Sequence, residues 1–504
     1  MKKKTFDISL TIFHKTIWSI IGIVIFSYEL SAQTIIKSTP EKVSSAYSDY
    51  ELIGNSPAGI LVHYFGQNQS ELISYDDNLK VKNRRELPYK GKDFKIESFL
   101  PTEHNLWLFY TLKENGYLYL RAKQMDNNLN IQNDYYPLDS ISNAAIGNEG
   151  KTFYVKTSPD KSKILLFGVI RSRASLFVRF TVLNDSLRIL SKNIFSFSDG
   201  KNPMLKSVRV NNNGYVTGVV GDVFNNFNTS DYDMERYTVY TYNPETKTIG
   251  EIPINDKDFA YKNLITETSN SRDIFYISAA YKNEQDKNDI GYIMKTIDFR
   301  TNNVLLSNTI KFTKDILQKT QTYDFNSWQD KASLFKPKRI IPRSDGGMLL
   351  ITEAEYKFTK VDRNSISNNG SYGVTPYAYS VRYVDQFQFY DMMSYSINKE
   401  GVIEWQSTMP KSQISEEDDA MYSSFAFFES NTLLKFLYHE DYYNSGNFIE
   451  YNLNPNGQSK RVSLFNSDKE NIAVVPKKGK QIDGFTMLLP SENKRNLQWV
   501  MLKY

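Results

Sequence analysis

The sequence predicts an all-β protein built from a repeated four-stranded unit, and three observations support this. Aromatic residues make up 14% of the 504 residues, led by 35 Tyr and 31 Phe, and such residues are favoured on pleated surfaces. A β-rich apolar segment recurs eight times along the chain. Seven hairpins that follow these segments share one kind of turn. Together these features predict a repeat protein made of sheets.

The eight apolar segments mark the second strand of each unit. They recur at uneven spacings of roughly 45 to 85 residues, the range expected for propeller blades with loop insertions. The segments are GILVHYF (59–65), NLWLFYTL (105–112), KILLFGVI (163–170), GYVTGVV (214–220), DIFYISAA (273–280), GMLLITEA (347–354), TLLKFLYH (432–439) and GFTMLLP (484–490). Continuous apolar runs are typical of strands packed on both faces, as between neighbouring blades.

The hairpin after each segment predicts the third and fourth strands. ELISYDDNLKV and MMSYSINKEGVIEW are two of the seven examples, and each turn contains Asp, Asn or Gly. These residues supply the positive φ or the side-chain hydrogen bonds that tight hairpins need. In the second example we expect Gly401 in the turn and Trp405 as an outer packing residue.

Repetition of this unit predicts a β-propeller of eight four-stranded blades. Seven blades remain the alternative if one divergent copy is two loops, and two tandem β-sandwiches are a further alternative. The last unit stops after its third strand, at LQWVMLKY. We therefore expect the N-terminal stretch QTIIKSTP to pair as the missing strand, which closes the ring and removes an exposed edge.

The N-terminus predicts export. Four Lys precede or flank the apolar run TIWSIIGIVIF, and ELSAQT supplies small residues for cleavage, so residues 1–33 are interpreted as a signal peptide. An uncleaved signal anchor is the alternative. Residues 34–504 are expected to form a single propeller domain with no transmembrane span. The expected location is periplasmic or extracellular, with outer-membrane association as a further alternative.

The longest insertion is predicted at 352–386, between the second and third strands of the sixth unit. Shorter ones occur at the same place in the fourth, fifth and seventh units, so all four should project from one face. The candidate binding residues are the tyrosines of these insertions, because Tyr offers a large contact area at low entropic cost. They are Tyr232, Tyr356, Tyr372, Tyr377, Tyr379, Tyr442 and Tyr443. Packing of these rings onto the disc is the alternative interpretation.

Other chemistry has little support in the sequence. The formal charge is +4 with scattered basic residues, so no nucleic-acid surface is expected. The absence of Cys excludes disulfides and thiolate sites, and His63, His104 and His439 lie in different units, so no metal or cofactor is expected. The acidic runs 231–235 and 416–419 lack the ligand spacing of a calcium loop. No serine-nucleophile motif occurs, and catalytic residues stay unassigned.

Two stretches resemble known families. TSPDKSKILLF (157–167) is similar to the blade start of TolB-like and WD40-like propellers, where the motif is structural. Residues 340–440 resemble a group of exported Gram-negative propeller proteins with no assigned activity, so the resemblance implies no catalytic residue. We expect an exported binding or scaffold propeller of the cell envelope, monomeric, recognising a protein or glycan through its insertion-bearing face. A propeller-fold hydrolase acting on polysaccharide or peptide is the alternative.

Overall fold

The computed structural model describes residues 33–504, apart from 89–92, 146–151, 172–174, 198–202, 225–233, 255–258, 284, 319, 321–326, 363–381, 441–445 and 494–495. The predicted signal peptide therefore lies outside the described residues, except for Gln33. No helix in the described part of the chain is long and apolar enough to cross a membrane.

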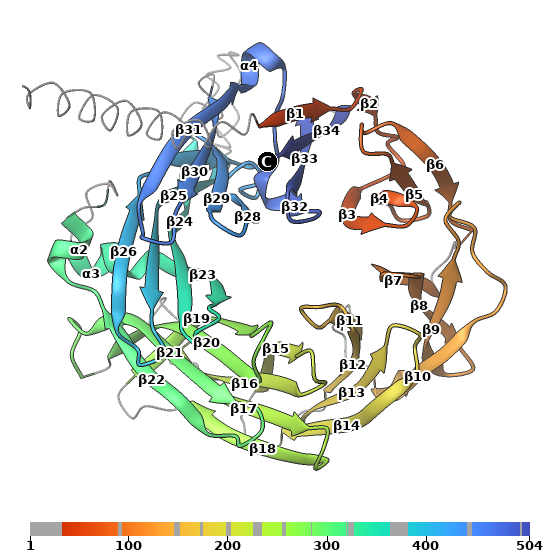
Figure 1. The fold of residues 1–504 in the computed structure, drawn as a ribbon, viewed down its shortest axis with the longest axis horizontal. Coiled ribbons are helices and arrows are strands. Elements are labelled where there is room, and N and C mark those ends of the chain that lie inside the picture. Colours follow the sequence, from red (N-terminus) through yellow and green to blue (C-terminus); the bar gives the residue numbers. More distant parts are fainter. Residues whose placement is uncertain are drawn as a thin grey trace, which may run out of the picture.

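The strands form eight four-stranded antiparallel blades around a central axis, as Figure 1 shows. Blades 1 to 4 consist of β3 (Asp49–Ser56), β4 (Gly59–Phe65), β5 (Ser70–Tyr75), β6 (Val81–Glu86); β7 (Phe94–Pro101), β8 (Leu106–Glu114), β9 (Tyr117–Met125), β10 (Tyr136–Ser142); β11 (Phe153–Thr157), β12 (Lys163–Arg171), β13 (Leu176–Asn184), β14 (Ile189–Phe197); and β15 (Pro203–Val210), β16 (Val216–Phe224), β17 (Met234–Asn243), β18 (Thr248–Ile254).

Blades 5 to 8 follow the same order. They consist of β19 (Phe259–Thr268), β20 (Ile274–Asn283), β21 (Ile290–Asp298), β22 (Val304–Lys311); β23 (Phe335–Pro342), β24 (Met348–Asp362), β25 (Arg382–Ile397), β26 (Ile403–Met409) with the added β27 (Gln413–Glu416); β28 (Ala426–Glu429), β29 (Leu434–His439), β30 (Asn447–Leu453), β31 (Ser459–Asn466); and β32 (Lys480–Gln481), β33 (Thr486–Asn493), β34 (Asn496–Lys503), β1 (Thr34–Lys37). The short β2 (Glu41–Lys42) also pairs with β34.

Few helices accompany the blades in the described part of the chain. They are α2 (Lys314–Gln318), α3 (Trp328–Ser333), α4 (Ser467–Glu470), η2 (Asn143–Ala145) and η4 (Pro476–Lys478). Helices α2 and α3 lie in the connector from blade 5 to blade 6. The all-β prediction and the count of eight blades are confirmed.

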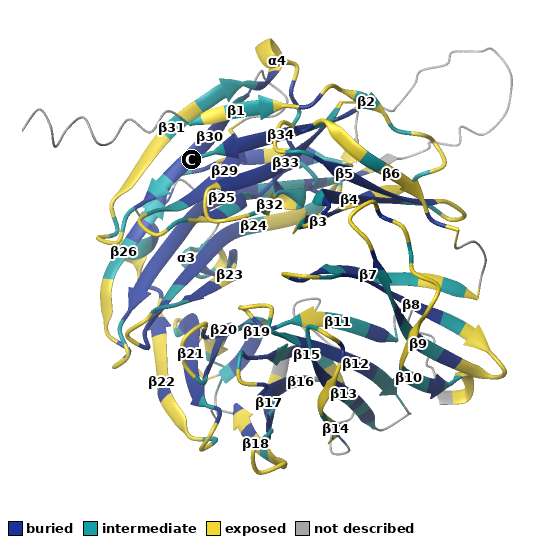
Figure 2. Ribbon diagram, turned by 45° about the vertical axis from the view of Figure 1, so that its right-hand side comes forward, coloured by how far each residue is buried: buried dark blue, intermediate teal, exposed yellow. Residues whose placement is uncertain are grey.

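The core lies between neighbouring blades. The second strand of each blade coincides with a predicted apolar run, and in β4 both Leu61 and Val62 are fully buried although they point to opposite faces. Val62 packs in the cluster shared with blade 8, and Leu61 in the cluster shared with blade 2. Figure 2 shows the resulting gradient, with buried middle strands and exposed outer strands such as β22 and β31.

The N-terminal strand closes the ring. Strand β1 pairs antiparallel with β34, with Thr34 opposite Lys503 and Ile36 opposite Met501. Figure 1 shows the two strands side by side. The closure predicted from the incomplete last unit is confirmed.

The hairpin turns use the chemistry predicted from the sequence. Asp76 Oδ1 accepts hydrogen bonds from the N–H groups of Asn78 (2.9 Å) and Lys80 (2.8 Å). Asn398 caps the turn of blade 6 in the same way, and Gly401 takes the positive φ of +85°. Trp405, on the outer strand of blade 6, donates from Nε1 to the carbonyl of Pro455 (2.9 Å) in the next blade. Gly401 and Trp405 thus have their predicted roles.

Candidate functional site

Among the described residues, blade 6 carries a platform that the other blades lack. We define it as residues 355–362 of β24, residues 382–389 of β25, and β27. Strands β24 and β25 have 15 and 16 residues, whereas their equivalents elsewhere have 6 to 10. Both ends of the insertion expected at 352–386 therefore form strands. The alternating sequence EYKFTKVD suits a sheet that is exposed to solvent on both faces. Strand β27 adds a third strand along β25.

The platform displays aromatic and aliphatic side chains. Tyr356 is 39% exposed, Val361 49% and Tyr383 65%. The Tyr356 ring stacks on Phe358, with centroids 5.3 Å apart. Val361 lies opposite Tyr383 on one face of the platform, whereas Tyr356 lies on the other face. Exposed apolar residues gathered on one part of a protein are typical of a binding surface. Tyr383 was not among the predicted binding residues, although it lies just beyond the predicted tyrosine cluster.

Of the seven tyrosines predicted to bind a partner, the structure describes Tyr356 alone, on β24. The remaining six lie outside the described residues: Tyr232, Tyr372, Tyr377, Tyr379, Tyr442 and Tyr443. Their role in binding stays a prediction.

A buried ion pair holds the base of the platform. Glu353 on β24 and Lys411, between β26 and β27, have fully buried side chains, and Lys411 Nζ lies 2.6 Å from Glu353 Oε1. Ser424 Oγ, in the connection to blade 7, donates to Glu353 Oε2 (2.6 Å). Lys411 Nζ also donates to Gln413 Oε1 (2.6 Å), whose amide donates to the carbonyl of His439 in blade 7 (2.8 Å). The platform is thereby tied to two blades.

Several lysines surround the ring of Phe389 beside this pair. The Nζ atoms of Lys338, Lys411 and Lys477 lie 5.8, 5.5 and 4.9 Å from the ring centroid. Burial lowers the pKa of Lys411, against the opposing effect of Glu353, and burial likewise lowers the pKa of Lys477. Burial raises the pKa of Glu355, but Lys338 and Lys336 outweigh it and hold that pKa below its usual value. No local pattern in the sequence predicts this cluster, because its members come from separate strands and connections.

His63 and His439 are buried in packed surroundings, whereas His104 is exposed. His63 Nε2 lies 2.7 Å from Ser70 Oγ, and the His63 ring packs 4.8 Å from that of Phe99. Burial lowers the pKa of His63 to about 4 and that of His439 to about 4. The part of the chain that the structure describes contains no group of three or more His, Asp or Glu that could hold a metal ion.

The two acidic runs of the sequence, 231–235 and 416–419, differ in position. Residues 231–233 lie outside the described part of the chain. Glu416 ends β27, where it accepts a hydrogen bond from Gln386 Nε2 (2.6 Å) and pairs with Lys360. The Glu416 carboxylate therefore stabilises the platform through an ion pair that joins β27 to β24.

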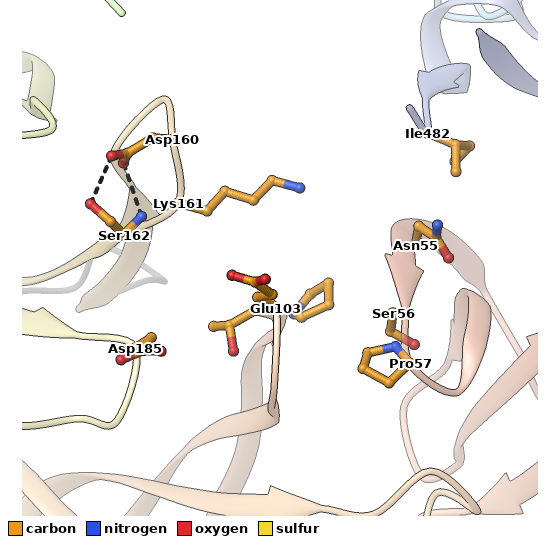
Figure 3. A pocket seen from close by; sticks show the side chains of 11 residues that line it. Asn55, Ser56, Pro57, Glu103, Asp160, Lys161, Ser162, Asp185 and Ile482 are labelled. Carbon is orange, nitrogen blue, oxygen red and sulfur yellow. Dashed lines mark hydrogen bonds between the residues drawn. The ribbon is translucent and has the colours of Figure 1, made fainter. Parts of the chain in front are cut away.

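The opposite face holds a wide cavity of about 710 Å³. The turns between the first and second strands of blades 1 to 3 line it, and Figure 3 shows Glu103 and Lys161 pointing into the space between them. Asp160, on the same wall, accepts hydrogen bonds from Ser158 Oγ (2.6 Å) and the Ser162 N–H (2.9 Å).

These contacts bear on the hydrolase alternative. Burial raises the pKa of Asp160, but the hydrogen bonds from Ser158 and Ser162 outweigh it, so its pKa lies below its usual value. A carboxyl that acts as a general acid needs the opposite shift. Asp160 therefore stabilises its own turn, which agrees with the structural role implied by the blade-start resemblance.

No family model matches the sequence, and no curated protein matches it. The fold is similar to several solved propellers. The WD40 domain of SCAP from fission yeast is 9% identical, with a TM-score of 0.38, over 94% of this chain and 98% of that one. An uncharacterised protein of Listeria monocytogenes is 10% identical, with a TM-score of 0.35, over 81% and 92%.

An enzyme is also among the similar structures. Prolyl oligopeptidase B from Galerina marginata is 10% identical, with a TM-score of 0.40, over 91% of this chain but 55% of that one, so the chain spans about half of its length. At such identities and scores the likeness carries no argument about function. Membership of the exported Gram-negative group stays a prediction.

Proposed function

We propose that the protein is an exported binding propeller of the cell envelope that recognises a protein or a glycan through the platform on its insertion-bearing face. The observation that carries the proposal is the exposure of Tyr356, Val361 and Tyr383 on strands that continue a blade of the disc. Aromatic side chains of this kind are enriched at the anchor points of interfaces.

Rigidity adds to this support. The platform is extended by hydrogen-bonded strands and its base is held by the buried pair of Glu353 and Lys411. A surface that is already ordered loses less conformational entropy on binding than a free loop does. Export and the envelope location rest on the N-terminal sequence of residues 1–33.

The hydrolase alternative has less support. The cavity opposite the platform is lined by carboxylates, but Asp160 is committed to its turn. The side chains of Ser70 and His63, which form a hydrogen bond, are buried against the ring of Phe99.

A shortened platform tests the proposal. In the shortened protein, the two residues Asn-Gly replace residues 359–385. They form a turn that connects Phe358 to Gln386, its cross-strand partner. A two-residue Asn-Gly turn suits such a hairpin, and β27 keeps its pairing with residues 386–389. The wild-type and shortened proteins are compared on a glycan array and by cross-linking mass spectrometry with an envelope fraction of the producing cells.

We expect the glycan signal or the cross-linked partner to disappear with the shortened platform. The matched control replaces Ile189 and Leu190 by Ser, because these residues are also exposed and apolar but lie on the outer rim of blade 3. Equal binding by the wild-type and shortened proteins would show that residues 359–385 do not form the recognition surface.

A further inference from the structure

Strand β24 has an open edge above the disc. Its neighbour β23 pairs with it from Met348 to Ala354, and the last contact is the hydrogen bond from the Glu355 N–H to the carbonyl of Leu334 (3.0 Å). Beyond Glu355, β25 pairs with one side of β24. On the other side, residues 357–362 pair with no further strand within the described part of the chain.

The direction of the backbone groups along this edge follows from two hydrogen bonds. In an antiparallel sheet, alternate residues direct both N–H and C=O to the same side. Because the Glu355 N–H points toward β23, the N–H and C=O groups of Lys357, Thr359 and Val361 point to the open side. The hydrogen bond from the Glu417 N–H to the carbonyl of Asp385 (3.0 Å), on the far edge of β25, requires the same alternation.

We propose that this edge pairs with the same edge of a second copy of the chain, antiparallel and centred on Thr359. In that register Thr359 lies opposite Thr359 of the second copy, and Lys357 lies opposite Val361. The three outward residues of each copy then exchange about six backbone hydrogen bonds. The pairing joins two platforms into one continuous six-stranded sheet.

The side chains fit this register. Lys360 lies opposite Phe358 of the second copy, just as Lys357 lies opposite Val361, so neither lysine of the edge faces a like charge. Centring the pair on Lys357 or on Lys360 would instead place two lysines directly opposite, which is unfavourable.

Lysines on an edge usually prevent such pairing. Here their charges are balanced within the platform. Lys357 Nζ lies 2.8 Å from Asp385 Oδ2, and Lys360 pairs with Glu416. The edge itself is accessible, because Lys357, Thr359 and Val361 are exposed. An open, charge-balanced and self-complementary edge favours a second copy over an unrelated strand.

The dimer leaves the insertion-bearing face reachable. Eight platform residues in strand conformation span roughly 25 Å, so the two discs stand apart at opposite ends of the shared sheet. In the dimer, side chains on a given face of one platform lie on the same side of the shared sheet as those on the equivalent face of the second platform. The sequence predicts a monomer, because no pattern in it identifies an open edge. The proposed dimer replaces that expectation.

Sedimentation velocity over a concentration series tests the pairing. We expect the wild-type protein to dimerise reversibly and Thr359→Pro to sediment as a monomer. The Thr359 N–H points to the open side, so proline removes no backbone hydrogen bond of the hairpin. It does remove the side-chain hydrogen bond from Thr359 Oγ1 to Asp385 Oδ1 (2.7 Å), which Thr359→Val removes equally. Thr359→Val keeps that N–H and should retain the dimer.

Thr359→Lys is the second test, because it places two unbalanced ammonium groups opposite each other and should also give a monomer. The far-ultraviolet circular dichroism of all three variants should match that of the wild type. A wild-type protein that remains monomeric up to its solubility limit overturns the proposal, even if it binds a strand from another protein. A dimer that persists in both Thr359→Pro and Thr359→Lys overturns it as well.

Discussion

The substitution Glu353→Gln should destabilise the platform, because it leaves the charge of Lys411 without its partner. Glu353 and Lys411 are fully buried and 2.6 Å apart. Breaking a buried ion pair by removing one member typically costs about 3–5 kcal/mol, because the remaining charge is desolvated and unpaired. Gln413 Oε1 still accepts from Lys411, so we expect the lower end, about 3 kcal/mol.

The pH dependence of this variant has a definite sign. Burial already lowers the pKa of Lys411, and loss of Glu353 removes a group that raises it. Below the usual lysine pKa the unfolded chain then binds more protons than the folded one, so the stability of the variant should rise with pH. The deficit relative to wild type should therefore shrink between neutral pH and about pH 10.

Denaturant unfolding, together with hydrogen exchange of the amides of β24, β25 and β27, measures both effects. The double variant Glu353→Gln with Lys411→Met is the matched control, because it removes both charges and should recover most of the lost stability. A Glu353→Gln protein with wild-type stability and wild-type exchange at the platform would refute the reasoning.

Three further predictions concern turns and buried histidines. Gly457→Ala places a Cβ 2.6 Å from the ring of Trp405 at a φ of +79°, so it should lower stability by more than about 1 kcal/mol and shift the tryptophan fluorescence. Leu129→Gly relieves a φ of +65° but removes a fully buried side chain, and a net loss of about 1–2 kcal/mol in denaturant unfolding is expected, whereas a gain would contradict the burial argument. Since burial lowers the pKa of His63 and of His439 from 6.5 to about 4, each should remove up to about 3 kcal/mol of stability as pH falls from 6.5 to 4. Replacing His63 by Asn should flatten this acid slope in thermal unfolding, and an unchanged slope would exclude its contribution.

Most of the architecture was readable from local sequence. The run KILLFGVI became the buried strand β12, and residues such as Asp76 and Asn398 form the side-chain hydrogen bonds of their turns. Strand β1 fills the place that the incomplete last unit left vacant. The strands and turns depend on residues close together in the chain, so composition and spacing are enough to predict them. The closure joins the two ends of the chain, but it follows from the missing strand of the last unit.

The site was less accessible to such reasoning. The sequence placed Tyr356 in an insertion, but it did not show that the insertion begins and ends as strand, nor that Tyr383 is more exposed. The other predicted tyrosines lie outside the described residues, so the prediction for them is unchanged.

The sequence by itself determined a ring of repeated blades, its closure, and the blade that carries the longest insertion. Only the tertiary structure decided that Lys338, Glu353, Lys411 and Lys477 meet around Phe389, and that β24 continues beyond β23 with an open edge. The physical reason is distance along the chain. Strand periodicity and turn chemistry act over a few residues, whereas the meeting of distant charges and the end of a neighbouring strand depend on how whole blades pack.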